Sequence, residues 1–288
     1  MIHYFTYRDE QLLVHHTLSE RPSENRMLPL MHAHEHYEIL YCISGDCEFI
    51  AEGCSYALTP GAALITRPAE VHHVRVVRDV PYERIVINFS DKMVESIDPE
   101  RRLLKPFNER AQGSLNRYEG QRLQAALENN IAPLRNDARP PIGQTRFDYD
   151  TSLELKIGVY AALRELQREF EGAHSAPNTA PRVGNAVLDF INEHLYESDL
   201  TTEMVASRFF ISRSQLNRSF NSLTGATVRE YIVAKRLIYA KQLIDAGGSA
   251  AAACEAACFA DYSTFYRAYR KKFAAAPTQR RNEGLGEN

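Results

Sequence analysis

Short apolar runs separated by turn residues predict β structure over residues 1 to about 90. The clearest runs are YEILYCI, CEFIAEG, AALITRP, HHVRVV and ERIVINFS. Turn residues such as Ser44-Gly45-Asp46 and Pro60-Gly61 lie between them. Strands of this length with regular turns are typical of a β sandwich or a small β barrel.

From about residue 91 the apolar spacing changes to that of amphipathic helices. Two segments, 118–135 and 152–170, carry an apolar residue at every third or fourth position. These positions are Leu123, Leu127 and Ile131 in the first segment, and Leu155, Val159, Leu163 and Leu166 in the second. Both stripes can pack on the predicted sheet, or one of them can pair with its copy in a second subunit.

A stretch of small residues and prolines, 171–184, separates this half of the chain from a wholly helical half. We therefore expect an N-terminal domain over 1–172, a linker over 173–182 and a C-terminal domain over 183–288. Helices are predicted in the last part over 183–196, 202–209, 213–223, 227–246, 249–257 and 262–273.

The helical half contains one pattern twice, about 49 residues apart. In each copy a short helix and a tight turn precede a second helix, which Ser212 or Asp261 can cap through its side-chain oxygen. The apolar positions of these second helices are Leu216 and Phe220 in one copy, and Phe265 and Tyr269 in the other. This is the pattern of a helix-turn-helix, whose second helix enters the major groove of DNA.

Polar side chains remain on the outer faces of both recognition helices. Arg and Asn suit guanine and adenine edges, while a basic run that ends in Lys272 suits phosphates. The candidate DNA-contacting residues are Arg213, Ser214, Asn217, Arg218, Tyr262, Ser263, Thr264, Arg267, Arg270 and Lys271. The helix between the copies is roughly 30 Å long, close to the ~34 Å that separates successive major grooves.

Residues 183–281 resemble the DNA-binding domain of the AraC/XylS family of bacterial transcription regulators. The matching residues are Ala206, Ser212, Leu216, Arg218, Phe220, Gly225, Tyr231, Arg236, Leu237, Ala240, Phe259, Asp261, Phe265, Arg267, Lys271 and Pro277. The resemblance places the base-reading positions of the family on Ser214, Asn217 and Arg218, and on Tyr262, Ser263, Thr264 and Arg267.

The chain departs from the pattern of this family at two places in the second copy. Cys258 stands where the family has glycine, and a left-handed backbone disfavours a residue with a Cβ, so we expect a remodelled turn. Ala250 to Ala253 replace a large apolar anchor, which predicts a looser second copy. Base discrimination is therefore expected to depend mainly on the first copy.

The sequence HAHEHYEIL, residues 32–40, places His32, His34, His36 and Glu38 at alternate positions. The surrounding segment resembles the sensor domain of the same family, a cupin-type double-stranded β-helix. The cupin-enzyme spacing H-x-H-x3-E-x6-G fits His32, His34, Glu38 and Gly45, and the resemblance implies a later histidine, which His72 or His73 supplies.

Three imidazoles and one carboxylate suit Fe, Mn, Ni or Zn. The candidate metal ligands are His32, His34, Glu38 and His73. A straight strand from His32 to Glu38 spans about 20 Å, so one ion reaches all four ligands only if the chain turns near His36 and Tyr37.

Three interpretations of this segment stay open: the rim of an effector pocket, a metal that assists effector binding, and catalysis. We favour the pocket rim and expect no resident cofactor, because fusion to a DNA-binding domain makes an enzyme the least economical account. The candidate effector-binding residues are His32, His34, Tyr37, Glu38, Arg67 and His72. Tyr41 and Tyr56 belong either to the pocket or to the core.

Composition and charge narrow the class of protein. A content of 44% hydrophobic and 25% charged residues is that of a soluble globular protein. The absence of a signal segment, and five cysteines without metal-ligand spacing, favour a reducing cytoplasm. The net charge of −3 hides an asymmetry, because residues from Arg182 onward carry 14 Lys and Arg against 11 Asp and Glu.

The sequence therefore predicts a transcription regulator and not an enzyme, with a β sensor domain and a double helix-turn-helix. The expected partners are double-stranded DNA, a small polar effector such as a sugar, a second copy of the chain in a homodimer, and RNA polymerase if the protein activates transcription. The alternative is a metal-dependent cupin enzyme that carries an accessory DNA-binding domain.

Overall fold

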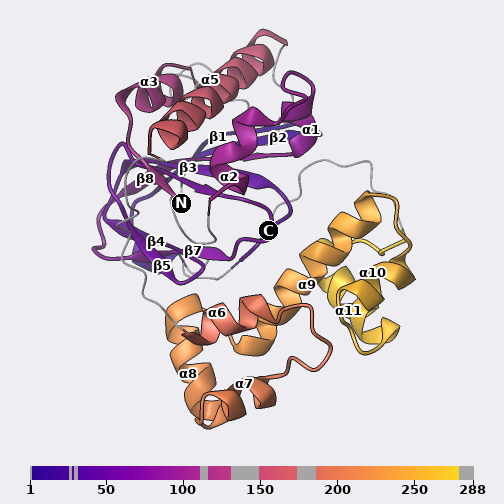
Figure 1. The fold of residues 1–288 in the computed structure, drawn as a ribbon. Helices are drawn as coiled ribbons and strands as arrows, with labels where there is room; N and C mark the ends of the chain where they lie inside the picture. Colours follow the sequence, from indigo (N-terminus) through magenta and orange to yellow (C-terminus); the bar gives the residue numbers. More distant parts are fainter. Residues whose placement is uncertain are drawn as a thin grey trace.

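The protein combines an N-terminal β domain with a helical C-terminal half (Figure 1). The computed structural model describes residues 2–25, 28, 32–110, 116–130, 149–173 and 186–278. The strands are β1 (Ile2–Arg8), β2 (Leu12–Ser19), β3 (Tyr37–Ser44), β4 (Cys47–Ala51), β5 (Cys54–Leu58), β6 (Ala63–Thr66), β7 (His72–Val76), β8 (Tyr82–Phe89) and β9 (Arg117–Tyr118). The predicted order, strands first and helices afterwards, is confirmed except for β9, which follows α2 (Lys105–Asn108).

Two antiparallel sheets form the β domain. The large sheet has the order β1-β2-β8-β3-β6-β9, and the small one the order β5-β4-β7. Alternate residues of β3 enter two different cores: Tyr37, Ile39 and Tyr41 face the helices, whereas Leu40 and Cys42 lie between the sheets. The large sheet is therefore buried on both faces, which explains the nearly continuous apolar sequence of β3.

Helices cover the outer face of the large sheet (Figure 1). They are α1 (Asp91–Glu95), α2 (Lys105–Asn108), α3 (Gln121–Asn130) and α5 (Tyr149–Ala173), with 3-10 turns at Pro22–Glu24 and Arg102–Leu104. The predicted stripes pack on this sheet, since Leu123, Leu127, Leu155, Val159, Leu163 and Leu166 are all at most 1% exposed. These side chains are thus unavailable for pairing between subunits, and Ile131 lies outside the described residues.

Six helices predicted for the C-terminal half are confirmed. They are α6 (Ala186–Glu193), α7 (Thr202–Arg208), α8 (Arg213–Thr224), α9 (Val228–Asp245), α10 (Ala250–Ala256) and α11 (Tyr262–Phe273). The predicted linker lies outside the described residues except for Ala173, which ends α5. In the described part of the chain, no helix is both long and apolar enough to span a membrane.

Local sequence fixes the ends of these helices. The Ser212 hydroxyl accepts a hydrogen bond from the backbone N–H of Gln215, and the Gln215 side-chain oxygen accepts one from the backbone N–H of Ser212, so a capping box starts α8. Asp261 caps α11 by accepting from the backbone N–H of Thr264, 2.8 Å away. Gly225 ends α8 in the left-handed conformation, with a φ of 77°. We call α7 and α8 the first unit, and α10 and α11 the second unit.

The helical half docks on the β domain through a buried polar contact. Glu52, in the turn between β4 and β5, lies 2.8 Å from Lys235 Nζ of α9. The two side chains are 2% and 4% exposed, and Tyr231 and Asn192 also donate hydrogen bonds to the Glu52 carboxylate. The sequence pattern gives no sign of this contact, because the partners lie far apart along the chain.

Candidate nucleic-acid interface and histidine cluster

The first recognition helix, α8, presents Ser214 and Arg218 to solvent. Arg213 is also exposed, and its guanidinium forms an ion pair with Glu203 at 2.6 Å. Asn217 is half-buried, and its side-chain oxygen accepts a hydrogen bond from the backbone N–H of Val228 at 3.2 Å. Asn217 therefore braces the start of α9 and keeps only its NH2 group for a base, which leaves Arg218 as the strongest candidate for base reading.

The second recognition helix, α11, exposes Tyr262, Ser263 and most of its basic side chains. The exposed basic residues are Arg267, Arg270 and Lys271, and Thr264 is half-buried. Lys272 differs from these residues, because its ammonium donates a hydrogen bond to the backbone oxygen of Ala33 at 2.9 Å. One basic side chain of the predicted phosphate-contacting run is thus held on the β domain.

Helix α9 joins the two units and sets their separation. It has 18 residues, which corresponds to about 27 Å. Arg236, in its middle, is buried and donates hydrogen bonds to three backbone oxygens, those of Leu195, Glu197 and Cys258, at 2.7 to 2.9 Å. Arg236 thereby ties the turn of the second unit and the loop before the first unit to one helix. The sequence showed Arg236 only as a shared family position, without this role.

The turns of both units contain a residue in the left-handed conformation that is not glycine. The φ angles are 55° at Phe210 and 54° at Cys258. The expected remodelling of the second turn is not observed, because Cys258 adopts the left-handed conformation despite its Cβ. Its carbonyl oxygen is bonded to Arg236 and its thiol donates to the backbone oxygen of Tyr196, so tertiary contacts hold the turn. Phe210 is 93% exposed at the first turn.

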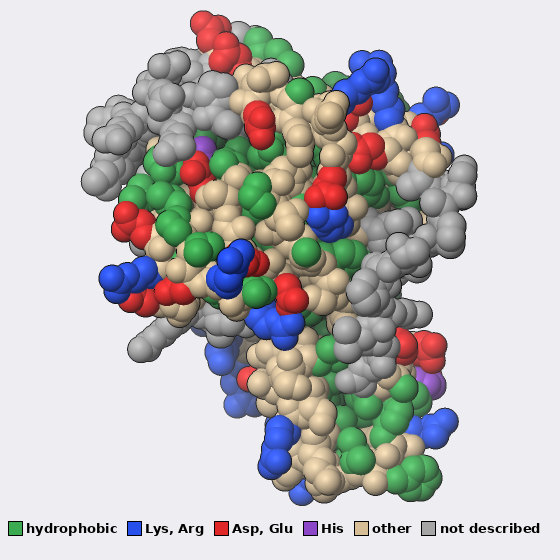
Figure 2. Space-filling view, turned by 90° about the vertical axis from the view of Figure 1, so that its left-hand side faces the viewer, with side chains coloured by type: hydrophobic (Ala, Val, Ile, Leu, Met, Phe, Trp, Pro, Cys, Tyr) green, Lys and Arg blue, Asp and Glu red, His purple; other side chains and the backbone are tan. Residues whose placement is uncertain are grey.

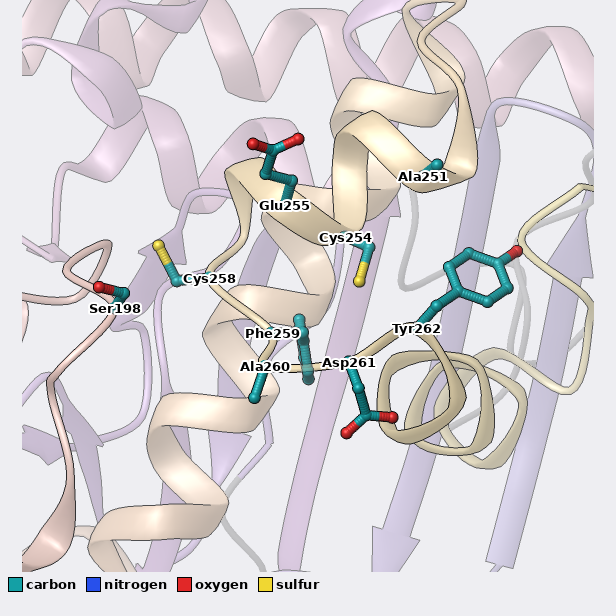
Figure 3. A pocket seen from close by; sticks show the side chains of 9 residues that line it. All are labelled: Ser198, Ala251, Cys254, Glu255, Cys258, Phe259, Ala260, Asp261 and Tyr262. Carbon is teal, nitrogen blue, oxygen red and sulfur yellow. The ribbon is translucent and has the colours of Figure 1, made fainter.

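A cleft of about 380 Å³ opens beside the turn of the second unit (Figure 3). Its lining residues are Ser198, Ala251, Cys254, Glu255, Cys258, Phe259, Ala260, Asp261 and Tyr262. The core of this unit relies on small side chains of α10, such as Ala253 and Cys254, against Phe265 and Tyr269. That the small side chains of α10 leave the second unit looser than the first stays a prediction.

The surface of the helical half is not uniform in charge (Figure 2). Most of the visible basic side chains lie along one edge of this half, and hydrophobic side chains gather towards the opposite edge, where acidic, basic and histidine side chains also lie. The visible face of the β domain instead carries acidic and basic side chains in mixed order. A basic edge on the helical half is the electrostatic feature that DNA binding requires.

Four potential metal ligands meet at the entrance to β3. The chain bends at Glu35 and His36, as the length of a straight strand required. His34 Nε2 comes within 3.1 Å of one Glu38 oxygen, and His72 Nε2 lies 3.4 Å from the other. The potential ligand atoms of His32, His34, Glu38 and His72 all lie within 4.8 Å of one another. We call these four residues the histidine cluster.

Backbone contacts orient the rings of this cluster. His34 Nδ1 donates to the His36 carbonyl at 2.9 Å, and His72 Nδ1 donates to the Glu70 carbonyl at 2.8 Å. Both rings therefore direct Nε2 towards Glu38. Of the two later histidines, His72 joins the cluster, whereas His73 points to the other face of β7, near Glu52 and Tyr231. His73 is thus not placed as the candidate ligand that the sequence suggested.

The charges of the cluster favour an ionised pair. Burial alone would raise the pKa of Glu38, but His72 and His34 hold that pKa well below its usual value. Burial alone would lower the pKa of His72, yet the Glu38 carboxylate raises it. Outside the cluster, burial lowers the pKa of His73 to about 4 and that of His36 to about 3.

The other candidate effector-binding residues do not join the cluster. Tyr37 packs between Phe89 and Phe107 under the helices, because adjacent residues of β3 face opposite sides. Arg67 donates its hydrogen bonds to backbone oxygens of residues 107, 108 and 110. Tyr41 and Tyr56 are core residues, with hydroxyls bonded to side chains of residues 128 and 116.

Two protein families match this chain. Residues 17–151 match the family described as "AraC-like ligand binding domain", and residues 205–283 match a family described as "Helix-turn-helix domain". ToxT from Vibrio cholerae is a similar solved structure, 12% identical, with a TM-score of 0.40 over 93% of this chain and 97% of that one.

Two relatives match about a third of the chain. "Probable transcriptional regulator LumQ" of Photobacterium leiognathi is 31% identical over 100 residues, which are 34% of this chain and 40% of that protein. "Uncharacterized HTH-type transcriptional regulator YijO" of Escherichia coli is 33% identical over 99 residues, which are 34% and 35%. The matches thus span less than half of either relative, and both names are those of regulators rather than enzymes. With its AraC-like ligand-binding domain followed by a helix-turn-helix domain, the chain belongs to the AraC family of transcription regulators.

Proposed function

We propose that the protein binds operator DNA through α8 and α11 and regulates transcription in response to a small molecule sensed by the β domain. The observation that carries this proposal is the pair of capped helices with exposed arginines, Arg218 on α8 and Arg267 on α11. Helix α9 joins the two units, and its Arg236 donates hydrogen bonds to the segments that precede both recognition helices. The length of α9 is compatible with two helices in successive major grooves of one duplex.

Alanine in place of Arg218 is expected to weaken operator binding more than alanine in place of Arg267. A bidentate contact of arginine with guanine is worth about 1–3 kcal/mol, so the loss at Arg218 corresponds to a fall in DNA affinity of about 5- to 150-fold. Operator sequences selected from a random duplex pool, followed by fluorescence anisotropy at one salt concentration, provide the measurement. Arg102→Ala, in the β domain, is the matched control. Tighter DNA binding by Arg218→Ala than by Arg267→Ala contradicts the greater importance of Arg218. Equal affinity of the wild type for selected and scrambled duplexes contradicts sequence-specific DNA binding.

The effector is proposed as a small molecule that reaches the histidine cluster, where His32 and His34 are only partly buried. The aromatic and guanidinium groups of Tyr37 and Arg67, which would suit a sugar, are committed to the core and to backbone oxygens. A sugar therefore has less support than the sequence suggested. Free cysteines, four buried and one half-buried, support a cytoplasmic location as part of this proposal.

A homodimer is proposed through the outer face of α5. Leu153 and Ile157, one turn apart, are 43% and 52% exposed, although the opposite face of the helix is buried. Sedimentation or light scattering is expected to give twice the 32.7 kDa of one chain. The double change Leu153→Glu and Ile157→Glu should yield monomers, while Glu154→Gln on the same helix should not. An unchanged dimer in the double variant places the interface elsewhere.

A further inference from the structure

The histidine cluster contains a contact that a neutral imidazole cannot satisfy. Because Nδ1 of His72 donates to a carbonyl oxygen, a neutral ring turns the lone pair of Nε2 towards the Glu38 carboxylate, which also only accepts. His72 is 2% exposed, and its Nε2 is buried without a hydrogen-bond partner. A positive charge between these atoms removes the conflict, and either a proton or a metal ion can supply it.

The donor set fits a first-row transition metal. Three imidazole nitrogens and one carboxylate are ligands that Zn²⁺, Ni²⁺ and Fe²⁺ accept. Ligand atoms of tetrahedral zinc lie about 3.4 Å apart when each bond is about 2.1 Å. The spread of up to 4.8 Å in the cluster closes to this value by a small movement of His32 and His34, which are only partly buried. Both also give an ion a path from solvent.

The segment that carries two of these ligands also holds the DNA-binding half. Ala33, between His32 and His34, is fully buried in the same core as the first unit. Its backbone oxygen accepts the hydrogen bond from Lys272 of α11. Glu35 forms an ion pair with Lys241 of α9 at 3.1 Å. We call the contacts of Ala33 and Glu35 with these two lysines the clasp.

We propose that His32, His34, Glu38 and His72 bind one divalent transition metal ion, and that the bound ion strengthens the clasp and weakens DNA binding. The first half of this proposal stands on the cluster alone, and the second half rests on the proposed function. The ion fixes residues 32–38 in the conformation in which Ala33 and Glu35 contact the two lysines. A ligand stabilises the state that it binds better.

The sign of the effect on DNA follows from Lys272. In the clasp its ammonium lies on the β domain, at the end of the recognition helix where basic side chains would neutralise phosphates. DNA binding gains this contact only when the clasp opens. Metal and DNA therefore oppose one another, and linkage requires that DNA weaken metal binding by the same factor.

Isothermal titration of the chelator-treated full-length protein with Zn²⁺ tests the site without DNA. We expect one Zn²⁺ per chain, and loss of this binding in the double variant His32→Ala with His34→Ala. His36→Ala, a change of the neighbouring histidine outside the cluster, should retain it. Circular dichroism establishes that each variant is folded. Absence of stoichiometric binding by the folded wild type, or equal binding by the double variant, overturns the site.

Anisotropy titrations with a selected operator duplex test the coupling. Zn²⁺ is expected to weaken DNA binding by the wild type about fivefold or more. Glu35→Gln should still bind one Zn²⁺ but show a smaller effect, because it breaks the ion pair with Lys241, one of the two contacts of the clasp, and leaves the ligands intact. Equal DNA affinity with and without Zn²⁺, or tighter binding with Zn²⁺, overturns the coupling. If the protein binds no DNA either with or without Zn²⁺, the proposed function is refuted, whereas the zinc titration still tests the metal site.

Discussion

Alanine at position 236 is expected to destabilise the helical half by about 3 kcal/mol or more, because hydrogen bonds from charged groups contribute about 1.5–3 kcal/mol each. Arg236 donates three such bonds, and its removal leaves the carbonyl oxygens of Leu195, Glu197 and Cys258 without their donor. Urea denaturation followed by far-ultraviolet circular dichroism, with the apparent midpoint compared among variants, is the measurement. DNA affinity should fall together with stability, because the hydrogen bonds that connect both units to α9 are lost.

Two variants sharpen this result. Arg236→Lys keeps the charge but cannot reach three oxygens at once, so most of the loss should remain. Arg229→Ala removes an exposed arginine from the same helix and should leave the midpoint nearly unchanged. A shift for Arg236→Ala no larger than that of Arg229→Ala would show that the three hydrogen bonds carry no net stability.

Removal of the Glu52 side chain is expected to undock the helical half from the β domain. Glu52→Ala leaves the buried Lys235 ammonium beside the Asn192 side-chain oxygen and the Tyr231 ring but without its carboxylate, and breaking a buried ion pair from one side costs about 3–5 kcal/mol. Separation of the two halves returns Lys235 to water, so this separation limits the cost. Small-angle X-ray scattering should show a larger radius of gyration, and the unfolding midpoint of the chain should fall.

The β domain offers a matched control for this change. Glu48, four residues earlier on β4, pairs with Arg75 at the surface, where 57% of the arginine side chain is exposed. Glu48→Ala should cost less than about 1 kcal/mol. The double change Glu52→Leu with Lys235→Met removes both charges and should recover much of the docking. A compact Glu52→Ala protein with an unchanged midpoint would contradict the role of this pair.

The helices were predictable because their signals are local. Ser212 and Asp261 fix the starts of the recognition helices through bonds to residues three positions ahead. Apolar spacing likewise identified Leu216 and Phe265 as core residues, and both are at most 1% exposed. The turn before β3 was stated only as the condition for one ion to reach both His32 and Glu38, and the chain does bend there, at Glu35 and His36.

Features that depend on partners distant in the sequence were not predictable. The pair of Glu52 and Lys235 joins positions 183 residues apart, and a lone glutamate in a turn carries no signal of burial. Asn217 looked free to read a base, but its oxygen supports the start of α9, which only the crossing of two helices reveals. The choice between His72 and His73 needed the register of β4 and β7, which places His72 opposite Ala51.

The separation of the helical half into two cores has a consequence for how such a protein can evolve. The first core contains Leu216 and Phe220, the second Phe265 and Tyr269, and α9 contributes residues to both. Changes at sites without shared neighbours are nearly additive in stability. One half of the DNA contact can therefore acquire a new sequence preference, or a core of small side chains such as those of α10, while the other half keeps its packing and preserves binding during the change.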